Sequence, residues 1–146
     1  GSFSKILLPS IRISFMILPK GLHELYINKY HIFNQGVSKL EQLTLALYMK
    51  EGLFKRHTKK LHTLYQKKND VITESLDKHD VSYRGNDSNL HVIIDFDDHQ
   101  DLVYFMKQCI KHNLQFEKIE DTLSVIFPYS GLEISEIPRV IDLLFY

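Results

Sequence analysis

The strongest constraint on the fold is the run of residues 53–78, which has helical periodicity over its whole length. At 3.6 residues per turn, such a run corresponds to about seven turns of helix. Gly52 separates it from the segment before it. An amphipathic helix of this length needs a second layer against its apolar face. That face consists of Phe54, Leu61, Tyr65, Ile72 and Leu76.

Shorter elements are expected before this helix. Ser38 and Glu41 have the spacing of a capping box, which predicts a helix beginning at Lys39. The almost continuously apolar residues 11–18 predict a buried strand, and residues 22–30 favour a short helix over a strand. The apolar stripe of the helix from Lys39 consists of Leu40, Leu43 and Leu47.

The second half of the chain alternates short β-type runs with helical ones. Asp97 with Gln100 predicts a helix start, and the last helix tolerates Pro138 only in its first turn. The order strand, long helices, then strand–strand–helix–strand–strand–helix predicts an α/β chain, packed as an α+β two-layer sandwich. The strands are expected at residues 81–84, 90–96, 114–118 and 123–127.

The composition fits a soluble, cytoplasmic domain. The 146 residues carry 18 basic and 18 acidic side chains, so net charge favours neither nucleic acid nor an acidic partner. The single Cys109 excludes an internal disulfide and is expected to be an unreactive core thiol. No apolar run approaches the roughly twenty residues of a membrane span, and the start does not read as a signal peptide.

Four residues near the start could hold pyridoxal phosphate. A lysine amine can form a Schiff base with this cofactor, and hydroxyls with a guanidinium can hold its phosphate. Arg12 within an apolar stretch also needs an anionic partner if it is buried. The alternatives are an ordinary exposed lysine and a Gly1-Ser2 left by an expression tag. The residues concerned are Ser2, Ser4, Lys5 and Arg12.

Residues 1–19 closely resemble the cofactor-lysine segment of the MocR/GabR group, which are GntR-type regulators with an aminotransferase-like domain of fold type I. The resemblance continues through residues 37–57, with a helix, a Glu-Gly break and an aromatic-x-Arg-His sequence. Asn89-Leu90-His91-Val92 is similar to a Gly-Leu-His strand of that group.

This resemblance implies that the chain is a fragment of such a regulator. Residues 1–36 would be the end of the large cofactor-binding domain, 37–79 long interdomain helices, and 80–146 the C-terminal small domain. DNA would be bound by an N-terminal winged helix outside the fragment. A homodimer and a small amine or amino-acid effector are also implied. The fragment alone is expected to bind little or no cofactor, because much of the pocket would lie upstream.

The resemblance also assigns roles to the four residues near the start. Lys5 would be the Schiff-base lysine, and Arg12 and Ser2 would contact the cofactor phosphate, assisted by Ser4. One departure stands against transamination: Ser124 takes the place of an arginine that grips the substrate carboxylate in the group. A sensor is therefore expected rather than an enzyme. A true aminotransferase and a cofactor-free dimerisation module stay open as alternatives.

Two other patterns have plain interpretations. The eight histidines are scattered along the chain, so no metal site is expected. The basic residues between Lys50 and Lys68 fit the solvated face of a helix, which is favoured over direct contact with DNA phosphates.

Overall fold

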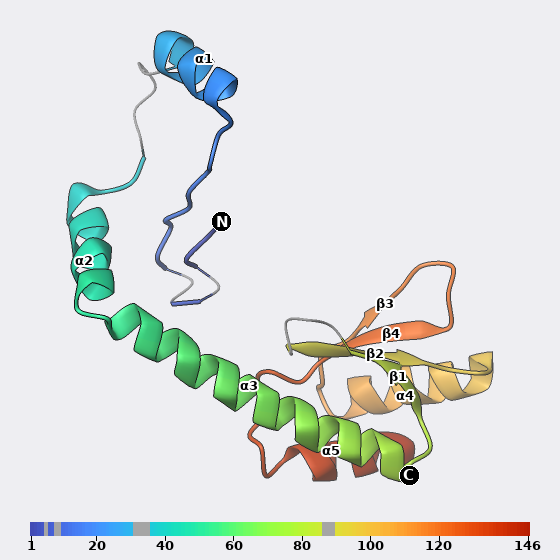
Figure 1. The fold of residues 1–146 in the computed structure, drawn as a ribbon. Helices are drawn as coiled ribbons and strands as arrows, with labels where there is room; N and C mark the ends of the chain where they lie inside the picture. The colour runs from blue at the N-terminus through green and yellow to red at the C-terminus, as the bar shows by residue number, and fades with distance from the viewer. Residues whose placement is uncertain (5, 8–9, 31–35, 86–89) are drawn as a thin grey trace. The chain divides into compact units, whose positions relative to one another are not determined.

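The computed structural model describes residues 1–4, 6–7, 10–30, 36–85 and 90–146. The chain divides into two compact units, residues 1–59 and residues 60–146 (Figure 1). Lys5 and Asn89, both singled out in the sequence, lie outside the described residues. No helix of the described part is long and apolar enough to cross a membrane.

The first unit holds two helices and the start of a third. Helix α1 spans Lys20–Tyr30, α2 spans Lys39–Lys50, and α3 spans Leu53–Lys78. All three were expected from the sequence, with α2 and α3 beginning at the expected residues. Gly52, between α2 and α3, has a φ of +71°, a backbone conformation that glycine adopts without strain.

The capping box expected at the start of α2 does not form. Ser38 is the N-cap residue, but its side chain makes no capping hydrogen bond. Instead, the side-chain amide of Gln42 donates to the carbonyl of Val37 at 3.1 Å. The expected start of the helix is therefore confirmed although the reason for it was wrong.

The expected strand over residues 11–18 is also wrong. Only an isolated bridge joins Ser2 and Ser14, with backbone hydrogen bonds from Phe3 to Ile13 and from Phe15 to Gly1. These contacts involve residues 1–3 and 13–15, so the described backbone forms a single bridge rather than a ladder over residues 11–18. Beyond it, Met16 and Ile17 are exposed rather than buried.

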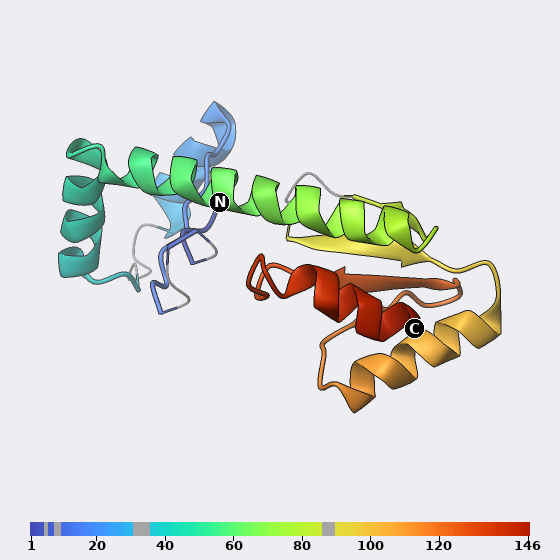
Figure 2. The same cartoon turned by 90° about the horizontal axis from the view of Figure 1, so that it is seen from below.

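The second unit is built around a four-stranded antiparallel sheet in the order β1-β2-β4-β3. Helices α4 and α5 contact each other (Figures 1 and 2). Pro138 lies in the first turn of α5, as expected. The strands are β1 (Ser82–Arg84), β2 (His91–Asp95), β3 (Glu117–Lys118) and β4 (Ser124–Pro128), and the helices are α4 (His99–Lys111) and α5 (Ile137–Phe145).

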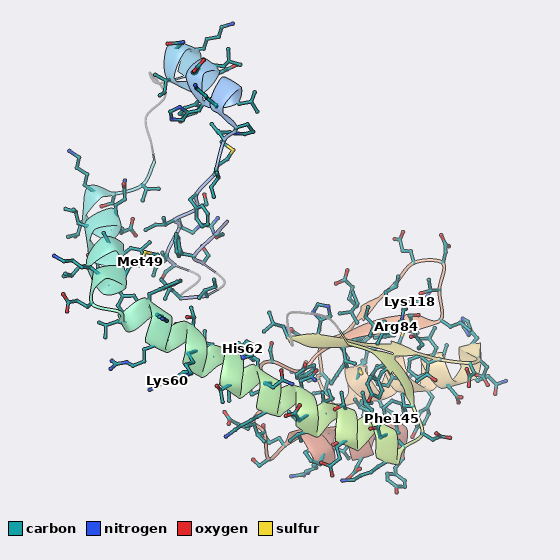
Figure 3. All side chains as sticks on the ribbon, in the orientation of Figure 1. Met49, Lys60, His62, Arg84, Lys118 and Phe145 are labelled. Atoms are coloured by element: carbon teal, nitrogen blue, oxygen red, sulfur yellow. The ribbon has the colours of Figure 1, made fainter. Side chains whose placement is uncertain are left out.

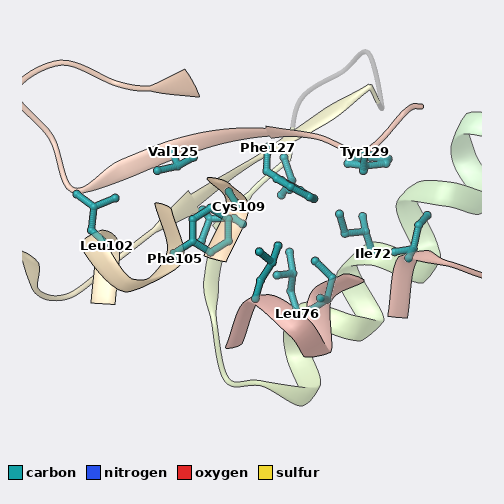
Figure 4. Close-up of a cluster of buried hydrophobic side chains, with 13 residues drawn as sticks. Ile72, Leu76, Leu102, Phe105, Cys109, Val125, Phe127 and Tyr129 are labelled. Carbon is teal, nitrogen blue, oxygen red and sulfur yellow. The ribbon is translucent and has the colours of Figure 1, made fainter. Parts of the chain in front are cut away.

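One face of this sheet packs on the helices. Val92 and Ile94 of β2 and Val125 and Phe127 of β4 alternate inward and are buried. They form one cluster with side chains of α3, α4 and α5, which makes the second unit the expected two-layer sandwich (Figure 4). The helix side chains in this cluster are Ile72, Leu76, Leu102, Phe105, Cys109, Ile137, Ile141 and Leu144.

Candidate functional site

The N-terminal segment holds the residues expected to bind a cofactor phosphate. The hydroxyl of Ser4 donates to the carbonyl of Ile11, and the backbone N–H of Ser4 donates to Ser2 Oγ at 3.3 Å. The first of these bonds joins residues 4 and 11 of the segment, and Lys5 lies outside the described residues. Ser2 is exposed and Ser4 is half-buried.

Arg12 differs from the expectation in its environment. The residues alternate here, so that Ile13 is buried while Arg12 and Ser14 face solvent. The expectation that Arg12 is buried and therefore needs an anionic partner is wrong. Within the described residues, Arg12 makes no ion pair. An exposed guanidinium of this kind keeps all its donors available to a phosphate or carboxylate.

The buried side of the same segment lines a cavity of about 490 Å³ against α2. The side chains that line it are mainly apolar, and a few polar side chains lie between them. This composition is usual for a small-molecule pocket. His57 is fixed there, because its Nε2 lies 2.9 Å from the carbonyl oxygen of Ile6. The lining residues are Leu7, Ile11, Ile13, Leu40, Glu41, Thr44, Leu45, Tyr48 and His57.

The sequence reasoning did not identify this cavity. The sequence predicts an apolar stripe on α2 without a role, and in the structure α2 has no buried residue. Leu40, Leu43 and Leu47 are 74%, 69% and 58% exposed. The available signal in the sequence was that stripe together with His57, Ile11 and Ile13. A sequence does not show which of these faces meet.

Ser124 and its neighbours form a separate polar cluster on the outer face of the sheet in the second unit. Asp95 pairs with Ser124 across β2 and β4, and its Oδ1 accepts a hydrogen bond from Ser124 Oγ at 2.6 Å. Arg84 on β1 donates to the same carboxylate through Nε at 2.7 Å and Nη2 at 2.8 Å. Figure 3 labels Arg84 on the sheet.

This arrangement fixes the charge states of the pair. The hydrogen bond from Arg84 is the main reason why the pKa of Asp95 lies below its ordinary value, with a smaller lowering effect from the Ser124 hydroxyl. The same hydrogen bond raises the pKa of Arg84. Because Nε and one Nη of Arg84 already bind Asp95, Arg84 cannot offer that fork to a ligand carboxylate.

The thiol and the possible metal ligands can also be placed among the described residues. Cys109 is buried in the core, and burial raises the pKa of its thiol to about 12, so the nucleophilic thiolate is scarce at neutral pH. In the parts of the chain that the structure describes, no three His, Cys, Asp or Glu side chains are grouped so that they could hold a metal ion.

Comparison with known proteins finds regulators by sequence. No protein-family profile matches the chain. It is 39% identical over 98 residues to the HTH-type transcriptional regulator YdeL of Bacillus subtilis, which is 65% of this chain and 21% of that protein. It is 28% identical over 104 residues to the pyridoxine biosynthesis regulator PdxR of Corynebacterium glutamicum, or 70% of this chain and 23% of that one. It is 32% identical over 91 residues to MocR, a probable rhizopine catabolism regulator of Rhizobium meliloti, which is 61% of this chain and 18% of that protein.

Comparison of structures finds aminotransferases. An archaeal alanine:glyoxylate aminotransferase matches 99% of this chain and 38% of its own, with a TM-score of 0.74 and 18% identity. The α-aminoadipate aminotransferase LysN of Thermus thermophilus, solved with N-(5'-phosphopyridoxyl)-L-leucine, matches 99% of this chain and 39% of its own, with a TM-score of 0.72 and 20% identity. The matched part is about a fifth of the length of the curated relatives.

Proposed function

We propose that this chain, a homologue of MocR-type transcriptional regulators with the fold of part of an aminotransferase, senses an effector through pyridoxal phosphate. One observation carries the proposal. The segment around Lys5 presents an exposed guanidinium at Arg12 that makes no ion pair with another described residue, together with the exposed hydroxyl of Ser2.

The donor set fits a phosphate. Arg12 can supply a charged fork and Ser2 a hydroxyl, which are strong partners for a phosphate dianion. Ser4 fits less well as a donor, because its proton already binds the carbonyl of Ile11. That bond would instead hold residues 4 and 11 of the segment together.

Each residue then has a limited task. Arg12 and Ser2 would bind and orient the phosphate, and Lys5 would supply the amine that anchors the cofactor and exchanges with the amine of the effector. When bound, pyridoxal phosphate supplies an electron sink for the carbons next to that amine. Residues 1–36 would belong to the large cofactor-binding domain, 37–79 to the interdomain helices and 80–146 to the small domain.

The cluster around Ser124 favours sensing over transamination. Ser124 cannot supply a bidentate cation, and the fork of Arg84 is taken by Asp95. An effector carboxylate would therefore have no charged clamp at this point of the sheet. The protein as a whole would act in the cytoplasm as a homodimer, with DNA bound by a helix-turn-helix segment outside these residues.

The test is to trap the lysine–cofactor bond in the full-length protein that contains this segment. After incubation with pyridoxal phosphate and reduction with borohydride, peptide mass spectrometry should find the phosphopyridoxyl adduct on Lys5. Lys5→Ala should abolish the adduct, whereas Lys29→Ala, at an exposed lysine of α1, should not. Arg12→Gln should weaken cofactor binding at least tenfold, as expected for the loss of a charged phosphate contact.

Three results would contradict the proposal. Absence of an adduct on Lys5 in the full-length protein would mean that Lys5 does not bind pyridoxal phosphate. An adduct retained in Lys5→Ala would place it on another lysine. Turnover of an amino donor at ordinary enzymatic rates, on the order of 1–10³ per second, would show an aminotransferase rather than a sensor.

A further inference from the structure

Helix α3 carries a concentration of positive charge that the proposed function does not use. Between Gly52 and Asn69 there are six lysines and arginines and no aspartate or glutamate. The chain as a whole is neutral, so this segment is locally very different from the rest. Five of the six cations are exposed, and only Lys68 is buried. The exposed ones are Lys55, Arg56, Lys59, Lys60 and Lys67.

These five side chains share one face of the helix, called here the basic face. Lys55 and Lys59 are four residues apart, as are Arg56 and Lys60, so each pair is stacked on one side. Lys67 follows Arg56 by three helical turns. The face is defined by the helical repeat of α3 alone and extends over about 18 Å at ~1.5 Å per residue. Figure 3 labels Lys60 and His62 on this helix.

Four of the five cations of the basic face form no ion pair with a described residue. No carboxylate of the described residues forms an ion pair with Lys55, Arg56, Lys60 or Lys67, whereas Lys78 near the end of α3 pairs with Glu74 at 2.9 Å. Like charges four residues apart destabilise a helix. Repulsion between Arg56 and Lys60 therefore raises the free energy of α3, and an anionic partner would relieve it.

The shape of the face indicates what kind of anion fits. The cations lie along one side of a helix rather than around a cavity, and none of them lines the cavity at the N-terminal segment. A single small anion could contact only two of them. Duplex DNA presents a matching line, with about one negative charge per 1.7 Å of its axis. A face of about 18 Å covers roughly half of a helical turn of ~34 Å.

We propose that the basic face of α3 binds the phosphate backbone of duplex DNA, in addition to the helix-turn-helix segment. The contact is independent of base sequence, because lysine and arginine side chains on phosphates carry no sequence information. It rests on the proposed function only in taking the full-length protein to be a DNA-binding regulator. Its role would be to hold DNA against the effector-sensing part.

The test uses the 146-residue chain and a fluorescently labelled duplex, followed by anisotropy at several salt concentrations. The chain should bind at low salt, with an affinity that falls steeply as salt rises. A variant with Lys55→Gln, Arg56→Gln, Lys60→Gln and Lys67→Gln should bind at least tenfold more weakly. Its slope of log affinity against log salt should be smaller by about one per lost phosphate contact.

The matched control removes four exposed cations elsewhere: Lys107→Gln, Lys111→Gln, Lys118→Gln and Arg139→Gln. This variant has the same net charge as the first and should bind DNA nearly as the unchanged chain does. Glutamine and lysine have similar helix propensities, and circular dichroism checks that both variants fold alike. The assay contains no pyridoxal phosphate, so a failure of cofactor binding leaves its outcome unaffected.

Several results would overturn the proposal. Absence of DNA binding by the unchanged chain at low salt would do so. Equal losses in the two variants would show a general charge effect rather than a defined face. The basic-face variant could also bind DNA as the unchanged chain does but lose binding to phosphatidylserine vesicles or to polyglutamate. That result would assign the basic face to a membrane or to an acidic protein instead.

Discussion

Asp95 accepts three hydrogen bonds from side chains on its two neighbouring strands, two from Arg84 and one from Ser124. The carboxylate and the guanidinium neutralise each other at the surface of the sheet. The Ser124 hydroxyl occupies the remaining side of the cluster. The hydroxyl of Ser124 therefore has a hydrogen-bond partner within the sheet. This is why a serine can be buried at this position without leaving an unpaired polar group.

The lowered pKa of Asp95 gives a pH dependence with a definite sign. Because the folded-state pKa lies below the ordinary value of about 3.9, the carboxylate stabilises the fold above that pH. The contribution is lost as pH falls through the folded-state pKa. We expect Asp95→Asn to lower the free energy of unfolding by about 1 kcal/mol at pH 7, and to have less effect near pH 3.

The measurement is urea unfolding at the two pH values, followed by amide NMR signals of β2. Asp97→Asn serves as the control, because Asp97 is exposed and two residues away. An Asp95→Asn variant as stable as the unchanged chain at pH 7 would mean that solvent competes fully with Arg84 for this carboxylate.

At the scale of elements, the sequence predicts the helices better than the N-terminal segment. Helical periodicity is a local property, so α3 and α5 could be placed from their own residues. The β-type runs also placed β2 and β4, whose residues Val92, Ile94, Val125 and Phe127 face one way. Residues 11–18 have an equally strong β pattern but form only an isolated bridge in the structure, and no local pattern records which segment a strand pairs with.

The site was less predictable for the same reason. Lys5, Ser2, Ser4 and Arg12 were selected by chemistry and resemblance, and their roles stay predictions. The bond from Ser4 to Ile11 and the exposure of Arg12 depend on how the segment folds back on itself. Likewise, the ion pair of Arg84 with Asp95 depends on strand register, which is a long-range property.

Two helix starts make a matched pair for measuring what a cap contributes. Asp98 caps α4 with its Oδ1, which accepts from the N–H groups of Gln100 and Asp101 at 2.7 and 2.9 Å. Ser38 begins α2 without such a bond. We expect Asp98→Ala to lower the free energy of unfolding by about 1 kcal/mol and Ser38→Ala to change it little.

Amide hydrogen exchange within α4 and α2 measures the two effects separately. Asp98→Asn, which keeps a side-chain acceptor, should retain most of the stability lost in Asp98→Ala. If Ser38→Ala and Asp98→Ala accelerate exchange equally in their helices, Ser38 caps α2 in solution. The capping box predicted from Ser38 and Glu41 would then be correct.

At the scale of the whole molecule, the buried core is distributed very unevenly. The large fully buried side chains belong to residues 72–144, in the second unit. In the described part of the first unit, Ile13 is the only buried hydrophobic residue, and neither α1 nor α2 has a buried side chain. Burial of apolar area is the main favourable term in folding, so the two units differ in their own stability.

We therefore expect hydrogen exchange in the intact chain to divide at about the unit boundary. Amides of β2, β4 and α4 should exchange only through global opening of the second unit. Amides of α1 and α2 should exchange much faster, because isolated helices of about 12 residues are marginal in water. Mass spectrometry of peptides from a timed exchange gives both sets in one experiment.

A pair of leucines provides the internal control for this division. Leu76 is fully buried in the core of the second unit, so Leu76→Ala should cost about 2–5 kcal/mol and accelerate exchange throughout that unit. Leu43 is 69% exposed on α2, so Leu43→Ala should leave the same amides unchanged. Slow exchange in α2 of the unchanged chain, lost in Leu43→Ala, would mean that this stripe is covered in solution, and a concentration series would then show whether a second copy covers it.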